Sequence, residues 1–158
     1  MEVRNMEITL SQKERMLLED QKNHEQICIE KYTNYANQAK DAQLKQIFIA
    51  NAQVERNHLN SINQLLSGKL PQMNQQQNTN SNQTMNNTQT AGVGLSDKDM
   101  CTDLLMTEKY VSGAYDTTIF EFRDTRVRDV LNHIQKEEQK HGEAIFQYME
   151  SKGMYNAQ

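Results

Sequence analysis

The two halves of the sequence repeat one another at a fixed offset of 83 residues. The offset relates Glu25 to Glu108 and Glu55 to Glu138. The other matched pairs are Tyr32 and Tyr115, Asp41 and Asp124, His58 and His141, Ile62 and Ile145, and Lys69 and Lys152. No gap is needed, and an ungapped match of this length indicates an internal duplication. The two halves are therefore expected to share one local fold.

Each half carries the terminal signals of two consecutive helices. Ser11 with Glu14 three residues later forms a capping-box pattern, and Asp41 and Asp124 are the expected N-caps of later helices. Gly68 and Gly153 follow the expected helix ends. Helices are expected over about 11–40, 41–67, 96–123 and 124–152. The sequence thus predicts an all-α fold, a four-helix bundle of two antiparallel hairpins.

A polar tract separates the two halves. In residues 72–90, seventeen of the nineteen side chains are Gln, Asn, Thr or Ser. Such a tract cannot bury enough apolar area to offset the entropy lost on ordering. We expect one domain over 1–158, with a first hairpin at 8–70, a crossover linker at 71–95 and a second hairpin at 96–155.

Charge and composition exclude several classes of partner and structure. The net charge of −4 argues against binding to nucleic acid or to an anionic membrane. No apolar run approaches the roughly 20 residues of a membrane span, and no secretory signal is recognisable, so we expect synthesis in the cytosol. Cys28 and Cys101 lack a C-x-x-C spacing and are predicted to be core residues.

Every predicted helix has an apolar stripe with ionisable groups near its middle. On the first helix the stripe is Leu18, Gln21, Glu25, Cys28, Tyr32, Tyr35 and Ala39. Glu25 and Glu55 lie fifteen residues on either side of the first turn, near residue 40, and Glu108 and Glu138 lie fifteen from the second, near residue 123. Equal distance from the turn of an antiparallel hairpin means equal height in the bundle. The four carboxylates are therefore expected at one level of the core.

Buried carboxylates need a compensating charge. Each has a desolvation cost of several kcal/mol, and no Lys or Arg lies on a stripe. Two divalent cations would balance four carboxylates, with one histidine three residues after a glutamate on each of two helices, the known pattern of di-iron and di-manganese bundles. The candidate metal ligands are Glu25, Glu55, His58, Glu108, Glu138 and His141. The alternatives are a metal-free remnant of such a site, or acids that face solvent.

Two tyrosines and two further histidines complete the candidate site. Tyr32 and Tyr115 are expected to direct their hydroxyls at the ligands, with plain core packing as the alternative. His24 and His133 lie off the stripes and are predicted to be surface or rim residues. Iron and manganese share oxygen and nitrogen ligands, so the metal could be either.

Two sequence passages carry a family resemblance. The first, from Glu25 through Tyr32 to Glu55-Arg-Asn-His58, resembles the rubrerythrin and ferritin-like superfamily. The second, from Glu108 through His141 to the closing Phe146-Gln-Tyr-Met-Glu-Ser-Lys-Gly-Met-Tyr155, is similar to the spore coat protein F family of endospore-forming Firmicutes. This resemblance implies a ferritin-like bundle that is made in the mother-cell cytoplasm and located in the spore coat.

The resemblance leaves two functions open. One is a structural or protective coat protein whose partners are other coat proteins, with a homodimer possible and neither nucleic acid nor membrane as a partner. The other is a redox enzyme of peroxidase, manganese catalase or ferroxidase type that acts on peroxide or oxygen. The ligand sets of structural and reactive two-metal sites overlap, so the sequence does not separate these functions.

Overall fold

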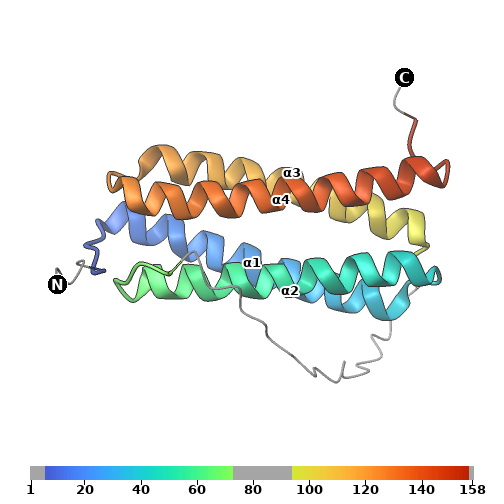
Figure 1. Cartoon of the computed structure of the whole chain (residues 1–158), viewed down its shortest axis with the longest axis horizontal. Helices are drawn as coiled ribbons and strands as arrows, with labels where there is room; N and C mark the ends of the chain where they lie inside the picture. The colour runs from blue at the N-terminus through green and yellow to red at the C-terminus, as the bar shows by residue number, and fades with distance from the viewer. Residues whose placement is uncertain (1–5, 73–93, 157–158) are drawn as a thin grey trace.

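Four long helices form a bundle of two antiparallel hairpins (Figure 1). The computed structural model describes residues 6–72 and 94–156. The helices are α1 (Gln12–Gln38), α2 (Ala42–Leu66), α3 (Asp97–Glu121) and α4 (Thr125–Ser151). The predicted all-α class and the four helices are confirmed. Most of the predicted linker, residues 73–93, lies outside the described residues.

The helix ends follow from local capping. The Ser11 side chain accepts from Glu14 N while the Glu14 carboxylate accepts from Ser11 N, which completes the predicted capping box. Asp41 and Asp124 are the N-caps of α2 and α4. Past the ends of α2 and α4, Gly68 and Gly153 have positive φ, a conformation that glycine adopts without strain.

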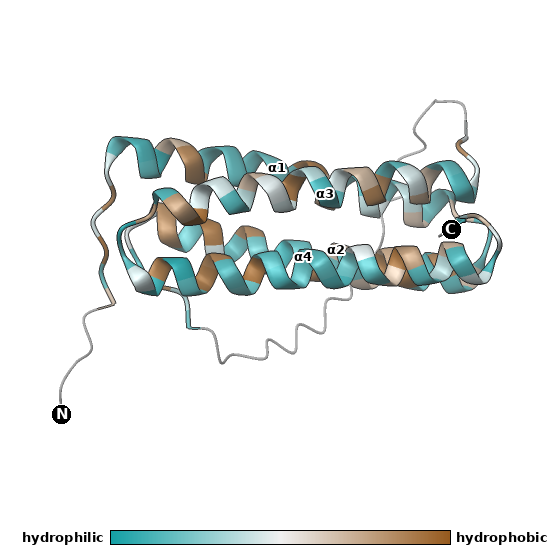
Figure 2. Ribbon diagram, turned by 90° about the horizontal axis from the view of Figure 1, so that it is seen from above, coloured by the Kyte–Doolittle hydropathy of each residue, from teal (hydrophilic) through white to brown (hydrophobic). Residues whose placement is uncertain are grey.

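The hairpins lie side by side, with α1 against α3 and α2 against α4 (Figure 2). All four neighbouring pairs run antiparallel (Figure 1). The C-terminal end of α2 and the N-terminal end of α3 lie at opposite ends of the bundle (Figure 1). No helix among the described residues is long and apolar enough to span a membrane.

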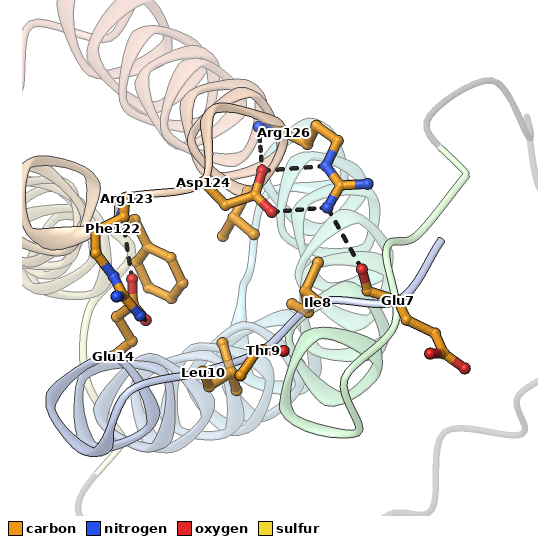
Figure 3. A pocket seen from close by; sticks show the side chains of 10 residues that line it. Glu7, Ile8, Thr9, Leu10, Glu14, Phe122, Arg123, Asp124 and Arg126 are labelled. Atoms are coloured by element: carbon orange, nitrogen blue, oxygen red, sulfur yellow. Dashed lines mark hydrogen bonds and ion pairs between the residues drawn. The ribbon is translucent and has the colours of Figure 1, made fainter. Parts of the chain in front are cut away.

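An acidic residue near the N-terminus of each hairpin accepts hydrogen bonds from the backbone of the turn in the other hairpin. Asp97 accepts from Lys40 N and Asp41 N at 3.0 and 3.1 Å. Its counterpart 83 residues earlier, Glu14, accepts from Arg123 N at 3.1 Å in the turn between α3 and α4 (Figure 3). We call these paired contacts the turn latches. They fix the relative height of the two hairpins.

The core follows the predicted stripes, with one correction. On α2, α3 and α4 every residue of the predicted stripe is buried. These stripes are Leu44, Phe48, Asn51, Glu55, His58, Ile62 and Leu65 on α2; Cys101, Leu104, Glu108, Val111, Tyr115, Thr118 and Phe122 on α3; and Val127, Leu131, Ile134, Glu138, His141, Ile145 and Tyr148 on α4. On α1 the stripe was wrong at its C-terminal end: Tyr35 and Ala39 are only half-buried, and Ala36 is fully buried. The predicted stripe alternates steps of three and four residues, a mean of 3.5, whereas the helix repeats every 3.6 residues. The buried face makes up the difference with two consecutive steps of four, from Cys28 to Tyr32 and from Tyr32 to Ala36.

Candidate metal centre

The six predicted ligands meet in the middle of the bundle. Glu25 comes from α1, Glu55 and His58 from α2, Glu108 from α3, and Glu138 and His141 from α4. The three acids Glu25, Glu55 and Glu138 have no exposed surface, and the other three residues are at most 5% exposed. The structure therefore brings together all six residues that the stripes and the repeat singled out. No Lys or Arg side chain among the described residues is buried with them.

The cluster divides into two overlapping groups. One contains Glu25, Glu55, His58 and Glu138, and the other contains Glu55, Glu108, Glu138 and His141. In each group one ligand atom per residue lies within 4.8 Å of the others, close enough to hold one ion. Glu55 and Glu138 belong to both groups. Glu25 and His58 belong only to the first group, and Glu108 and His141 only to the second.

Several of the clustered atoms are buried without a hydrogen bond. Among the described residues, the atoms without a partner include one carboxylate oxygen each of Glu25, Glu55 and Glu108, both oxygens of Glu138, and His58 Nδ1. His58 Nδ1 lies 2.7 Å from Glu138 Oε1, yet the two atoms are not aligned for a hydrogen bond. His141 Nδ1, by contrast, is hydrogen-bonded to Glu55 Oε1 at 2.8 Å. Unsatisfied buried oxygens are costly, and the oxygens that converge here without a partner fit a shared cation. Oxygen and imidazole donors also suit divalent iron or manganese.

The electrostatics of the cluster without a cation are unfavourable. Burial, followed by the neighbouring Glu25, raises the pKa of Glu55 well above its ordinary value. Burial and then Glu108 do the same to the pKa of Glu138. Burial also opposes ionisation of Glu25, but its hydrogen bonds outweigh that effect and lower its pKa. The two carboxylates common to both groups are thus the ones that most resist carrying charge unaided.

Two tyrosines connect the hairpins at the centre. Tyr32 of α1 donates its hydroxyl to Glu108 Oε1 of α3 at 2.6 Å, and Tyr115 of α3 donates to Glu25 Oε1 of α1 at 2.6 Å. Both rings are fully buried. Each hydroxyl bonds one oxygen of a carboxylate, and the other oxygen of that carboxylate is buried without a hydrogen bond among the described residues. This is how the partners of metal ligands usually orient them.

Glu137 is a functional candidate that sequence reasoning missed. Its Oε1 lies 3.0 Å from His58 Nε2 and 3.0 Å from His133 Nε2. A carboxylate on the far nitrogen of an imidazole fixes which nitrogen faces the centre. Glu137 lies one residue off the α4 stripe, so the sequence pattern did not separate it from surface acids. The i, i+4 spacing from His133 was the available signal.

The two cysteines and the two other histidines lie outside the cluster of ligands. Cys28 and Cys101 are both free and fully buried, as predicted. His133 is exposed and His24 is half-buried beside Gln21, in agreement with the surface or rim prediction. Burial raises the pKa of Cys101 to about 12, so this thiol is an inert core group.

Comparison with known proteins gives two matches. Residues 96–158 match the family described as Coat F domain, which confirms the resemblance for the second hairpin. A crystal structure of a two-domain protein from Anabaena variabilis ATCC 29413, with DJ-1/ThiJ/PfpI-like and ferritin-like domains, matches 95% of this chain with a TM-score of 0.70 at 11% identity. This chain spans 40% of the length of that protein. No curated protein matches the chain in sequence. The fold is thus a ferritin-like four-helix bundle.

Proposed function

We propose that this chain, whose second hairpin matches the Coat F domain, is a spore coat-associated protein that binds two divalent iron or manganese ions in its core. The observation that carries the proposal is the set of buried carboxylate oxygens that converge without hydrogen bonds. A core with four clustered glutamates and no buried Lys or Arg among the described residues must bind cations or take up protons to avoid unpaired buried charge.

In this proposal the ligands have distinct roles. Glu25 and His58 would hold one ion, Glu108 and His141 the other, and Glu55 and Glu138 would contact both. Tyr32 and Tyr115 would hold the outer carboxylates in place, and Glu137 would keep His58 Nδ1 turned towards its ion. Bound iron or manganese would stabilise the fold and could supply one-electron redox chemistry.

A structural or protective role in the coat is our first choice. Because the ligands of one ion come from both hairpins, metal binding would join the two halves of the bundle and raise its stability. The spore coat location is supported by the Coat F match. Other coat proteins are the proposed partners.

A redox enzyme acting on peroxide or oxygen is the second candidate. The two metal positions share both Glu55 and Glu138, so two redox-active ions would lie side by side. In that case the manganese- or iron-loaded protein should consume hydrogen peroxide, and Glu55→Ala or Glu138→Ala should abolish the turnover. Absence of turnover in the wild type with either metal would leave the structural role.

The test of metal binding is a titration of metal-free protein with manganese(II) in a calorimeter. We expect two ions per chain, and Glu55→Gln should weaken both binding steps by at least about 10-fold, since Glu55 contacts both positions. The matched control is Glu143→Gln, an exposed acid on the same helix as Glu138, which should bind two ions like the wild type. Failure of the wild type to bind, or equal binding by Glu55→Gln, would contradict the proposal.

A further inference from the structure

A groove between α3 and α4 lies beside the carboxylate cluster on one side of the bundle. Its volume is about 530 Å³, and its lining includes the two ligands Glu108 and Glu138. Gly113 and Ser112 line it from α3, and Gly142 lines it from α4. Of the six proposed ligands only Glu108 and Glu138 line the groove. Glu138 belongs to both ligand groups and Glu108 only to the group with His141, so the groove lies on the side of that second group.

The absence of side chains at two helical positions contributes to this groove. Gly113 and Gly142 lie in the interiors of α3 and α4, where glycine is among the least favourable residues. A Cβ added at Gly113 would meet no atom within 4 Å, and one added at Gly142 would lie 3.8 Å from Leu105 Cδ1. Close packing thus does not require glycine at either position. An open space beside the centre is the feature that these residues provide.

The related face between α1 and α2 is built differently. At positions 83 residues earlier, Leu59 stands in place of Gly142 and Ile29 in place of Ser112. Arg56 of α2 also reaches across to α1, with Nη2 3.3 Å from Thr33 Oγ1. The duplication has therefore diverged at the surface positions beside the centre, while the ligands themselves have been kept.

The two ligand histidines, His58 and His141, also differ in their surroundings. His58 Nε2 is held by Glu137, whereas His141 Nε2 is buried and has no hydrogen-bond partner among the described residues. The counterpart of Glu137 in the first hairpin is Val54, which cannot serve His141 in the same way. The ring orientation of His58 is therefore fixed by a hydrogen bond to its outer nitrogen, and that of His141 is not.

We infer that the centre has one closed and one open position: ligands from solution reach the ion held by Glu108 and His141 through the α3–α4 groove. This inference rests on the proposed metal binding. Glu108 is 3% exposed and Glu138 is not exposed, so only a thin layer of side chains separates the floor of the groove from the cluster, and passage would be restricted to a ligand of a few atoms. Lys109 and Asp116 both line the groove, so its mouth carries no net charge from these two side chains and any preference for an anion would come from the bound ion. The matching chemical class is a small oxygen or nitrogen donor such as peroxide, for which azide is a stable probe.

The test uses the protein loaded with two cobalt(II) ions and follows azide binding by visible absorption. Wild type should bind azide saturably at one of its two ions. Gly142→Leu, which installs the residue found at the related position of α2, should raise the azide dissociation constant at least 10-fold with two cobalt ions still bound. Gly142→Ala should have a small effect. Glu143→Leu, which adds the same side chain at the next, exposed position, is the matched control and should bind azide normally.

The outcomes separate the inference from the proposed function. If Gly142→Leu does not fold, Gly113→Leu narrows the groove from α3 and should weaken azide binding by the same reasoning. Unchanged azide affinity in a folded, cobalt-loaded groove variant would overturn the inference and leave metal binding intact. Failure of the wild type to bind two cobalt ions would overturn the proposed function, and the inference with it.

Discussion

Three of the four glutamates in the central cluster have one oxygen hydrogen-bonded to a neighbour and the other buried without a hydrogen bond among the described residues. Tyr115 holds Glu25, His141 holds Glu55, and Tyr32 holds Glu108. Glu138 has neither oxygen hydrogen-bonded among the described residues. These orientations are set by side chains of other helices, so a metal-free protein must either keep charged oxygens unpaired or take up protons.

The burial of these carboxylates predicts that the stability of the metal-free protein falls as pH rises. The pKa values of Glu55 and Glu138 are raised by burial and by nearby carboxylates, and that of His58 is raised because its acidic partners outweigh burial. The folded state then binds more protons than the unfolded state, and its stability falls as pH rises above the ordinary Glu value of 4.5. Glu25 and Glu108, whose pKa values are lowered, have the opposite effect and only at lower pH.

The measurement is thermal unfolding at pH 5.5 and pH 8. For metal-free protein we expect the midpoint to be lower at pH 8, by about 4–8 °C for a loss of about 2 kcal/mol at this chain length. The manganese-loaded protein should lose much less, because the metal stabilises the charged carboxylates. A metal-free protein that becomes more stable over this interval would contradict the assignment of these shifts to the cluster.

At the scale of the helices, the turn latches hold the two hairpins at a common height. Asp97 accepts two backbone N–H groups from the α1–α2 turn, and Glu14 accepts one from the α3–α4 turn. The same acids lie in the first turns of α3 and α1, where negative charge is favourable. Register in the bundle therefore depends on contacts at its ends as well as on core packing.

The latch predicts a specific loss of stability for Asp97→Ala. Removing an acceptor of two backbone hydrogen bonds should lower the free energy of unfolding by about 1–3 kcal/mol. Asp99→Ala removes an exposed acid from the same helical turn and is the matched control, with an expected loss well below that of Asp97→Ala. Urea titration of both variants measures the difference. Equal stabilities would show that the latch contributes nothing beyond charge at the helix terminus.

The sequence was most informative where local chemistry or the repeat decides the structure. Caps such as Ser11 and Asp41 bond within three residues of themselves, so helix ends were predictable. Glu137 and the α3–α4 groove were not, because their significance depends on which side chains face them across the bundle. Tyr35 was misplaced because a stripe extrapolated along a long helix loses phase.

For the molecule as a whole, a duplicated bundle has kept its inner ligands and diverged around them. Both hairpins contribute to each ligand group, so neither half could form a complete centre alone. The side facing α1 and α2 has Leu59 and Arg56, and the side facing α3 and α4 has glycines and a groove. The two hairpins therefore share an origin and a ligand pattern, but the surroundings of the cluster differ between its two sides.

The most direct test of the central claim is anomalous diffraction from crystals of the manganese-loaded protein. Our account predicts two peaks per chain inside the bundle, about 3.5–4 Å apart as in other two-metal sites, with Glu55 and Glu138 in contact with both. A map with no peak among these side chains, or with manganese bound only at surface carboxylates, would contradict it.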